Sequence, residues 1–245
     1  VNADPDGTNI NAGCGATEPA GLQAVVTAER AHVGIALDGD ADRLIAVDER
    51  GDVVDGDHII AICAADQRDR GLLHDDTVVV TVMTNLGFRL AMEEAGIEVV
   101  ETPVGDRYVL EALAAGGYSL GGEQSGHVVF TRHATTGDGL LTALVLLDIV
   151  RRSGRPLSVL AAEAMTQLPQ VLLNVPVAER RPDVADLLAD DIDRWSDELG
   201  HTGRILVRPS GTEPLVRIMV EAPTADLADQ VAESLRTALL ATLGA

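Results

Sequence analysis

Apolar residues follow two spacings along this chain, and each spacing predicts a different kind of element. Alternating or continuous apolar runs of about four to eight residues are typical of strands, whereas apolar residues three and four positions apart are typical of helices. Helices are predicted at residues 17–30, 58–70, 86–95, 107–115, 140–152, 182–199 and 224–243. Strands are predicted at residues 31–37, 44–47, 77–83, 97–101, 171–177, 204–207 and 215–221.

Capping residues and glycines mark where these elements begin and end. We expect Thr17 to cap the first helix, and glycines such as Gly71 and Gly96 to end later ones. Residues 118–130 form a further extended segment that glycines interrupt. Strands and helices alternate through the middle of the chain, which predicts an α/β fold with a mixed sheet and covering helices.

Two changes in the pattern divide the chain into three parts. We place domain boundaries near Asp57 and Pro169, which gives residues 1–57, 58–169 and 170–245. The last part is predicted to be a small α+β domain. The chain opens with Val1 and a turn-rich segment, so we expect residues 1–57 to be the end of a larger domain and the chain to be a fragment.

Composition narrows the classes of partner. A hydrophobic content of 46% over 245 residues predicts a globular protein with a sizeable core. The net charge of −21 disfavours nucleic acid and anionic membranes as partners, so any anion site must be local. Cys14 and Cys63 have no metal-binding spacing and suggest free thiols in a reducing compartment. No membrane span or signal peptide is recognised, and a cytoplasmic protein is predicted.

The segment Asp38-Gly39-Asp40-Ala41-Asp42-Arg43 lies between two predicted strands. Three carboxylates at every second position of a tight loop repel one another unless a cation lies between them. Oxygen ligands suit a hard divalent ion, so Asp38, Asp40 and Asp42 predict a Mg²⁺ site.

Three other interpretations account for parts of this loop. An acidic surface turn is possible in a chain that is acidic throughout. An EF-hand begins in the same way but needs Gly at the sixth position, where Arg43 stands, and flanking helices. A haloacid-dehalogenase-type phosphatase needs Thr or Val in place of Asp42 and a later Lys, and this chain contains no Lys.

Two glycine-bearing loops carry further candidate chemistry. Residues 208–214 join two predicted strands and offer Arg208, Ser210, Gly211 and Thr212 as a phosphate cradle, with Arg217 on the next strand as a second guanidinium. An ordinary hairpin is the alternative. In residues 121–127, the side chains of Glu123, Ser125 and His127 are able to hydrogen-bond sugar hydroxyls, although a polar turn between strands explains them equally well.

Taken together, these loops resemble those of the α-D-phosphohexomutases. The shared motifs are DGDADR at 38–43, GEQSGH at 122–127 and RPSGTEP at 208–214, in this order. Residues 2–15, 81–85, 104–108 and 136–139 are similar to the phosphoglucosamine mutase branch in particular, and Gln124 favours that branch over the phosphomannomutase/phosphoglucomutase branch.

The resemblance implies a role for each matched residue. Asp38, Asp40 and Asp42 would bind Mg²⁺ together with a phosphoserine, and Glu123 and Ser125 would hold sugar hydroxyls. The phosphate cradle would grip the phosphate that does not react, and Arg43 and Arg107 would face the phosphoryl group that is transferred. We assign Arg43, Arg107 and His127 as the candidate catalytic residues. The implied fold is a set of phosphohexomutase-type α/β domains followed by a C-terminal α+β phosphate-binding domain.

The implied reaction interconverts glucosamine 6-phosphate and glucosamine 1-phosphate through a phosphoserine and a bisphosphate, for cell-wall precursor synthesis. The implied partners are a hexosamine phosphate and the N-terminal half of the same protein, because none of the chain's serines is followed by the family's His-Asn-Pro. Two alternatives stay open: a phosphomannomutase/phosphoglucomutase, and a non-catalytic module that binds Mg²⁺ and a phosphosugar.

Overall fold

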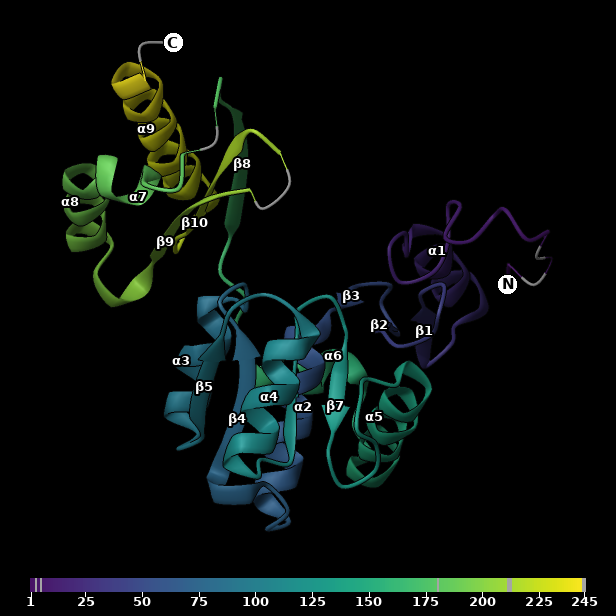
Figure 1. Cartoon of the computed structure of the whole chain (residues 1–245). Helices are drawn as coiled ribbons and strands as arrows, with labels where there is room; N and C mark the ends of the chain where they lie inside the picture. The colour runs from purple at the N-terminus through teal and green to yellow at the C-terminus, as the bar shows by residue number, and fades with distance from the viewer. Residues whose placement is uncertain (3, 5, 180, 211–212, 244–245) are drawn as a thin grey trace. The chain divides into compact units, whose positions relative to one another are not determined.

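The computed structural model describes residues 1–2, 4, 6–179, 181–210 and 213–243. These residues form two compact units, residues 1–166 and residues 167–245 (Figure 1). Each unit has its own sheets and its own buried core, so each is described separately.

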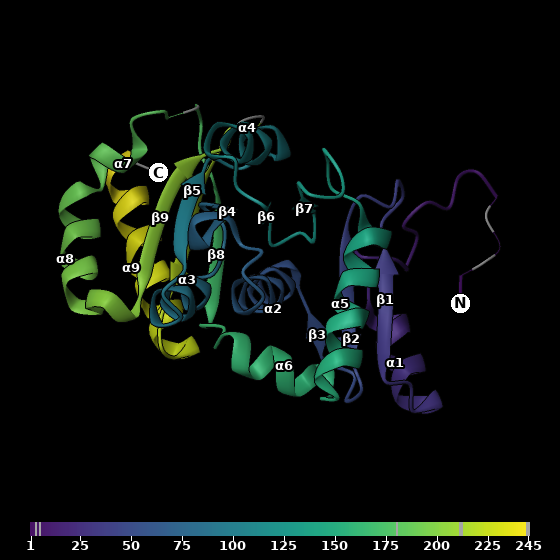
Figure 2. The ribbon, with the colours of Figure 1, turned by 90° about the horizontal axis from the view of Figure 1, so that it is seen from below.

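The first unit begins with a small antiparallel sheet that carries the acidic loop. Its strands are β1 (Val33–Leu37), β2 (Leu44–Asp48) and β3 (Val53–Val54), in the order β1-β2-β3. Leu37 pairs with Leu44 across the loop, so the acidic segment is the connection of a hairpin. Helix α1 (Ala20–Glu29) packs on one face of the sheet and α5 (Gly139–Ser153) on the other (Figure 2).

A four-stranded mixed sheet forms the rest of this unit. The strand order is β5-β4-β6-β7, with β4 parallel to β5 and β6, and β7 antiparallel to β6. The strands are β4 (Thr77–Thr81), β5 (Glu98–Thr102), β6 (Leu120–Gly122) and β7 (Val128–Phe130). The remaining helices are α2 (Gly56–Asp69), α3 (Leu86–Glu94), α4 (Asp106–Gly116) and α6 (Leu157–Ala164), with a 3₁₀ turn, η1 (His74–Asp76).

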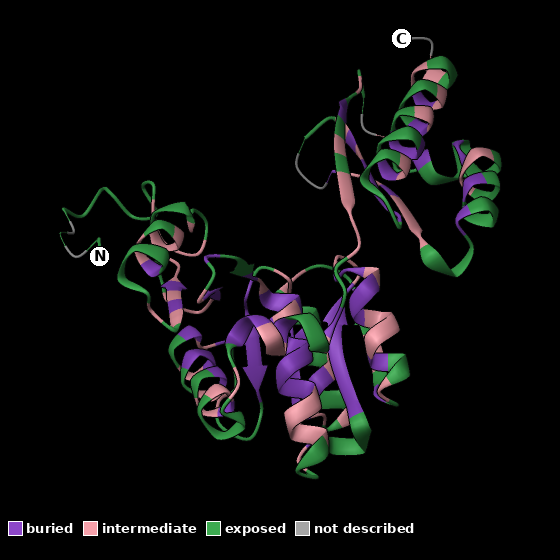
Figure 3. Cartoon of the chain, turned by 180° about the vertical axis from the view of Figure 1, so that it is seen from behind, coloured by how far each residue is buried: buried purple, intermediate pink, exposed green. Residues whose placement is uncertain are grey.

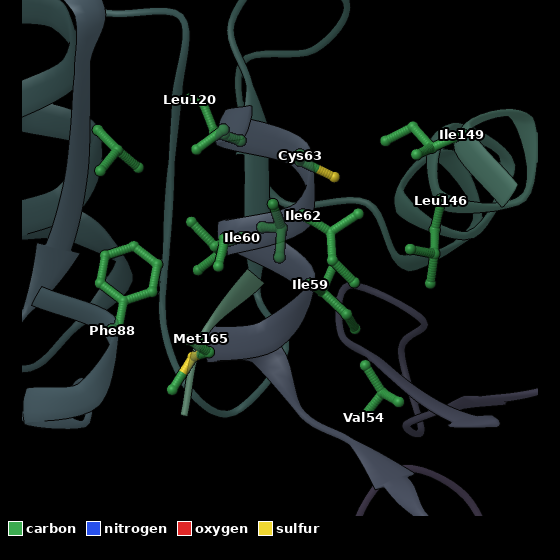
Figure 4. Packing of buried hydrophobic residues seen from close by; sticks show 14 of the residues in the cluster. Val54, Ile59, Ile60, Ile62, Cys63, Phe88, Leu120, Leu146, Ile149 and Met165 are labelled. Atoms are coloured by element: carbon green, nitrogen blue, oxygen red, sulfur yellow. The ribbon is translucent and has the colours of Figure 1, made fainter. Parts of the chain in front are cut away.

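Alternation along β4 divides the core between the two faces of the sheet. Val78 and Val80 belong to the large cluster on the α2 side, whereas Val79 packs with Val109 and Leu113 of α4 on the other side. Buried residues dominate α2 and β4 (Figure 3). Helix α2 lies between Phe88 of α3 and Leu146 of α5 (Figure 4), so it is the central helix of this unit.

The second unit is a three-stranded antiparallel sheet with helices on one face. Its strand order is β8-β10-β9, and side chains of β10 such as Ile218 and Val220 pack with those of the last helix. The strands are β8 (Gln170–Pro176), β9 (Arg204–Pro209) and β10 (Leu215–Glu221). The helices are α7 (Val184–Leu187), α8 (Ala189–Leu199) and α9 (Ala225–Leu243), with a 3₁₀ turn, η2 (Gly200–Thr202).

The predicted α/β class is confirmed, and three local predictions are wrong. Helix α1 begins after Pro19, so Thr17 is not its N-cap. Helix α6 was not predicted, and the single helix predicted for residues 182–199 is two helices that meet at Leu188. Leu188 is buried, and packing of its side chain at this junction outweighs continuous helical spacing. The three-part division stays a prediction, since one hydrophobic cluster extends from Leu44 to Met165.

Across the part of the chain that the structure describes, every helix is too short or too polar to cross a lipid bilayer.

Candidate functional site

The acidic loop gathers its three carboxylates at the end of the β1–β2 hairpin. Carboxylate oxygens of Asp38, Asp40 and Asp42 lie within 4.8 Å of one another. The turn is tight: the main-chain N–H of Ala41 donates to the Asp38 carbonyl oxygen at 3.2 Å, and Ala41 has a φ of 61°. A left-handed conformation is unfavourable for alanine, and such strain is found where a loop has a function.

Charges within the loop are only partly balanced. Nε of Arg43 lies 3.3 Å from Oδ2 of Asp38 and 3.7 Å from Oδ1 of Asp42, and the Arg43 main-chain N–H donates to Asp38 Oδ1. Burial raises the pKa of Asp42; repulsion by Asp38 and Asp40 raises this pKa further, and His127 opposes the rise. Within the loop, one guanidinium therefore accompanies three carboxylates and lies near two of them, so the loop retains excess negative charge.

This donor set fits Mg²⁺. Oδ1 of Asp42 is buried and accepts no hydrogen bond from any residue described, although a buried carboxylate oxygen normally has a partner. A hard cation prefers carboxylate oxygens and would satisfy this atom while relieving the repulsion between the three side chains. The loop residues that could hold the ion are thus Asp38, Asp40 and Asp42.

Residues 121–127, named the sugar loop here for the sugar-binding side chains predicted in it, are joined directly to the acidic loop. The main-chain N–H of Leu44 donates to the Gly126 carbonyl oxygen at 3.0 Å, and Arg43 forms an isolated antiparallel bridge with His127. Gly126 has a φ of 93°, and a Cβ at this position would lie 2.1 Å from the Leu44 carbonyl oxygen. Only glycine allows this approach, so the two loops predicted separately lie side by side.

His127 is buried beside the acidic loop. Its side chain is 4% exposed, and Nε2 is 3.7 Å from Oδ2 of Asp42. A Cβ on Gly137 would lie 2.4 Å from His127 Nε2, and Gly139 donates its main-chain N–H to the carbonyl oxygen of Ala41. The segment that opens α5 therefore holds both the imidazole and the acidic loop in place.

Glu123 connects the sugar loop to the turn that precedes α4. Its Oε1 accepts the main-chain N–H of Gly105 at 3.0 Å, while Ser125 next to it is exposed. Arg107 follows in the first turn of α4; its side chain is 77% exposed, and its Nε donates to Oε1 of Glu111 at 2.7 Å. Arg107 therefore lies two residues after the contact with the sugar loop, and it is paired with a counter-ion in its own helix.

The second unit contains the predicted phosphate loop between β9 and β10. Arg208 and Arg217 pair across the two strands, so both side chains stand on one face of the sheet. Partial burial and the neighbouring Arg217 lower the pKa of Arg208, and Nε of Arg217 is buried without a hydrogen-bond partner among the residues described. Ser210 is buried and its Oγ accepts the Glu213 main-chain N–H at 3.3 Å. Two adjacent, partly buried cations are residues that could hold an anion; Gly211 and Thr212 lie outside the described residues.

Residues at the start of α2 were not predicted as part of any site. Asp55 caps this helix, Gly56 touches the sugar loop, and Asp57 is fully buried. The signal in the sequence is the acidic run Asp55-Gly56-Asp57 directly before an apolar helix, which was interpreted only as a domain boundary.

Two models of one known family match this chain. Residues 55–168 match the model of the phosphoglucomutase/phosphomannomutase α/β/α domain III, and residues 172–238 match the model of the C-terminal domain of the same family. Together the two matches span well over half of the chain. The chain belongs to the phosphoglucomutase/phosphomannomutase family.

Several bacterial members of the family are similar along nearly the whole chain. Proteins named phosphoglucosamine mutase from Frankia alni, Frankia casuarinae and Oceanobacillus iheyensis are 59%, 60% and 51% identical. The matches cover 98–100% of this chain and 53–55% of those proteins. The chain therefore spans about half the length of the curated relatives it matches.

Solved structures of the family have the same fold. The N-acetylphosphoglucosamine mutase of Aspergillus fumigatus, in complex with GlcNAc-6P and magnesium, has a TM-score of 0.74 at 25% identity, over 94% of this chain and 57% of that one. A phosphoglucomutase/phosphomannomutase family protein of Burkholderia thailandensis has a TM-score of 0.73 at 25% identity, over 93% of this chain and 51% of that one.

Proposed function

We propose that this chain is the part of a phosphoglucosamine mutase that binds Mg²⁺, the sugar and the non-reacting phosphate. The observation that carries the proposal is the direct connection between the acidic loop and the sugar loop, through Leu44 and Gly126. A metal-binding loop that is hydrogen-bonded to a sugar-binding loop would place the ion next to a sugar hydroxyl. This arrangement suits the transfer of a phosphoryl group to or from that hydroxyl. The names of the bacterial relatives, at 51–60% identity, support glucosamine phosphate as the substrate.

In this proposal Asp38, Asp40 and Asp42 hold one Mg²⁺. When bound, the ion neutralises charge that develops on the transferring phosphoryl group. Arg43 orients Asp38 through its main-chain N–H and its Nε, and it adds a positive charge at the rim of the loop. Arg107 leaves Glu111 to face the same phosphoryl group, which is feasible because an exposed ion pair on a helix contributes only about 0.3–0.5 kcal/mol.

The sugar and its second phosphate are held by the other two loops. Glu123 uses Oε1 for Gly105. We propose that its Oε2 accepts a hydrogen bond from one sugar hydroxyl and that the Ser125 hydroxyl donates one to the neighbouring hydroxyl. Arg208, Ser210, Gly211, Thr212 and Arg217 take the phosphate that does not react. Guanidinium groups bind phosphate oxygens through paired, charge-assisted hydrogen bonds, which suits a chain whose net charge of −21 repels anions at longer range.

His127 remains a predicted catalytic residue. A catalytic role requires contact with the substrate, and the ring is buried against Asp42 in this structure. We therefore propose that its role in the described conformation is to orient Asp42.

The family's reaction also needs a phosphoserine, and we place it in the part of the protein that this chain does not span. Phosphoryl transfer between two positions of one sugar needs a nucleophile that holds the group between half-reactions. We further propose a cytoplasmic enzyme, since Cys14 and Cys63 are both free thiols.

A coupled assay tests this function. The chain alone, with Mg²⁺ and a sugar bisphosphate, is expected to form no glucosamine 1-phosphate, whereas the chain mixed with the N-terminal half of the Frankia alni relative is expected to form it. Glucose 6-phosphate and mannose 6-phosphate in the same assay test the phosphoglucomutase and phosphomannomutase alternatives. Robust turnover by the chain alone, or a preference for glucose or mannose phosphate, would contradict the proposal.

A further inference from the structure

The first turn of α2 contains a carboxylate that is costly to bury. Asp57 is 0% exposed, and its Oδ2 accepts the main-chain N–H of Asn85 at 2.8 Å. Burial raises the pKa of Asp57 to about 7, and the nearby Asp55 carboxylate raises it too. Hydrogen bonds from the Asn85 amide and the Thr84 hydroxyl, and the neighbouring His58, oppose the rise. Burial of an ionisable carboxylate generally lowers stability, so the presence of Asp57 calls for another explanation.

Gly56, the preceding residue, is in direct contact with the sugar loop. Its main-chain N–H donates to the carbonyl oxygen of Gln124 at 3.1 Å. A Cβ at this position would lie 2.2 Å from the Glu123 carbonyl oxygen and 2.7 Å from the Gly126 nitrogen. The backbone of α2 therefore approaches the sugar loop as closely as glycine permits.

The same short segment is linked to the neighbouring turns. Asp57 fixes the turn between β4 and α3 through Asn85, whose own side chain caps α3 at Gly87. The sugar loop in turn contacts the α4 turn through Glu123 and Gly105. The start of α2 is thus a junction of loops at one end of the four-stranded sheet.

We propose that Gly56 and Asp57 are positioning residues that set the sugar loop in its binding conformation. This inference rests on the proposed function of that loop. Asp57 holds the start of α2 against the β4–α3 turn through its hydrogen bond with Asn85. Gly56 then holds the main chain of Gln124 through its own hydrogen bond. Neither residue touches the substrate, so both act through the backbone of the sugar loop.

Substitution of Gly56 gives the cleaner test. In Gly56→Ala the new methyl group must displace Glu123, while alanine in the first turn favours the helix itself. Gly21→Ala in α1 is the matched control, because a Cβ there meets no atom within 4 Å. We expect Gly56→Ala to weaken glucosamine 6-phosphate binding by about tenfold or more, in the range of losses seen when supporting residues of a site are changed, and Gly21→Ala to leave it unchanged.

Asp57 is tested by removing and then restoring its acceptor. Asp57→Leu removes the acceptor for Asn85 and is expected to weaken binding by a similar factor, whereas Asp57→Asn keeps a carbonyl acceptor and is expected to bind within about threefold of wild type. Asp48→Leu is the control, since Asp48 is equally buried but accepts the main-chain N–H groups of Arg50 and Asp52 in a turn away from the sugar loop. We expect Asp48→Leu to lower thermal stability without changing affinity.

The outcomes separate this inference from the proposed function. Amide hydrogen exchange and NMR shifts of residues 123–126, measured without ligand, report the loop directly and are expected to change in Gly56→Ala and not in Gly21→Ala. If wild type does not bind glucosamine 6-phosphate, the proposed function is wrong whatever the loop does. If wild type binds glucosamine 6-phosphate and Gly56→Ala binds it with an affinity within twofold of wild type, the inference is wrong. This comparison remains decisive even if Asp57→Leu does not fold. Loss of affinity in Asp57→Asn as large as in Asp57→Leu would also contradict the role of Asp57 as an acceptor.

Discussion

The main-chain N–H of Leu44 donates a hydrogen bond of 3.0 Å to the carbonyl oxygen of Gly126. Leu44 directly follows the acidic loop, and Gly126 belongs to the sugar loop, although the two residues are far apart in the sequence. This bond fixes a carboxylate cluster next to a loop rich in hydroxyl-binding groups. The backbone position of either loop therefore depends on the other.

Gly126→Ala is expected to disrupt both loops. The added Cβ would lie 2.1 Å from the Leu44 carbonyl oxygen, in addition to the cost of the positive φ. Gly154→Ala is the control, because Gly154 also has a positive φ but a Cβ there meets nothing within 4 Å. We expect the control to lose about 1 kcal/mol of unfolding free energy, as for alanine in a left-handed conformation, and Gly126→Ala to lose clearly more. Chemical denaturation measures both; equal losses would contradict the close contact.

Asp40→Asn is expected to weaken Mg²⁺ binding and leave the fold unchanged. Asp40 is exposed and supports no core, but it supplies one of three clustered carboxylates, so affinity should fall by about tenfold or more. Asp75→Asn removes an equally exposed carboxylate outside the loop and should have no effect. Isothermal calorimetry compares the three proteins, and equal Mg²⁺ affinity in Asp40→Asn and wild type would rule out the metal assignment.

Arg208→Ala is expected to remove most phosphate binding by the second unit. A hydrogen bond to a charged group contributes about 1.5–3 kcal/mol, which corresponds to roughly 10- to 100-fold in affinity. Arg236→Ala, on the exposed surface of α9 in the same unit, removes the same charge and should leave affinity unchanged. Titration with inorganic phosphate and with glucosamine 6-phosphate measures this difference; similar losses in both variants would show that only net charge matters.

Asp57→Asn is expected to change how stability depends on pH. The pKa of Asp57 is raised to about 7 in the folded protein, so the folded state binds a proton that the unfolded state has lost. The free energy of unfolding is therefore highest below the ordinary pKa of an aspartate, and it falls as the pH rises toward 7. From pH 5 to pH 8 the variant should gain about 2–3 kcal/mol relative to wild type. Hydrogen exchange of the β4 amides measures the unfolding free energy of the first unit. A difference between variant and wild type that stays constant with pH would contradict a buried, ionisable Asp57.

Local patterns in the sequence predict much of this fold, because most elements have a strong apolar periodicity and clear end signals. The strands on both sides of the acidic loop are confirmed as β1 and β2, and the phosphate loop does join two strands. Helix α6 was missed because its sequence, LSVLAAEA, is short and almost uniformly apolar, so it shows no amphipathic period. Pro156 before a run of good helix formers was the available signal.

The site was predictable as separate loops, and its connections were not. Motif spacing indicates three carboxylates in one turn, but it contains no information on the hydrogen bond between Leu44 and Gly126, which depends on packing between distant segments. The roles of Gly56 and Asp57 were hidden for the same reason. A glycine required by a distant carbonyl oxygen looks like any turn glycine in the sequence.

Titration of the chain with glucosamine 6-phosphate in the presence of Mg²⁺, followed by amide NMR, tests the central claim most directly. We expect saturable shifts in residues 122–127 and in residues 208–210 and 213–217, with loss of the first set when Mg²⁺ is removed or Asp40→Asn is used. Inorganic phosphate should shift only the second set. Shifts confined to other parts of the chain, or no saturable shift in either loop, would contradict binding of hexosamine phosphate by the sugar loop of the first unit and the phosphate loop of the second.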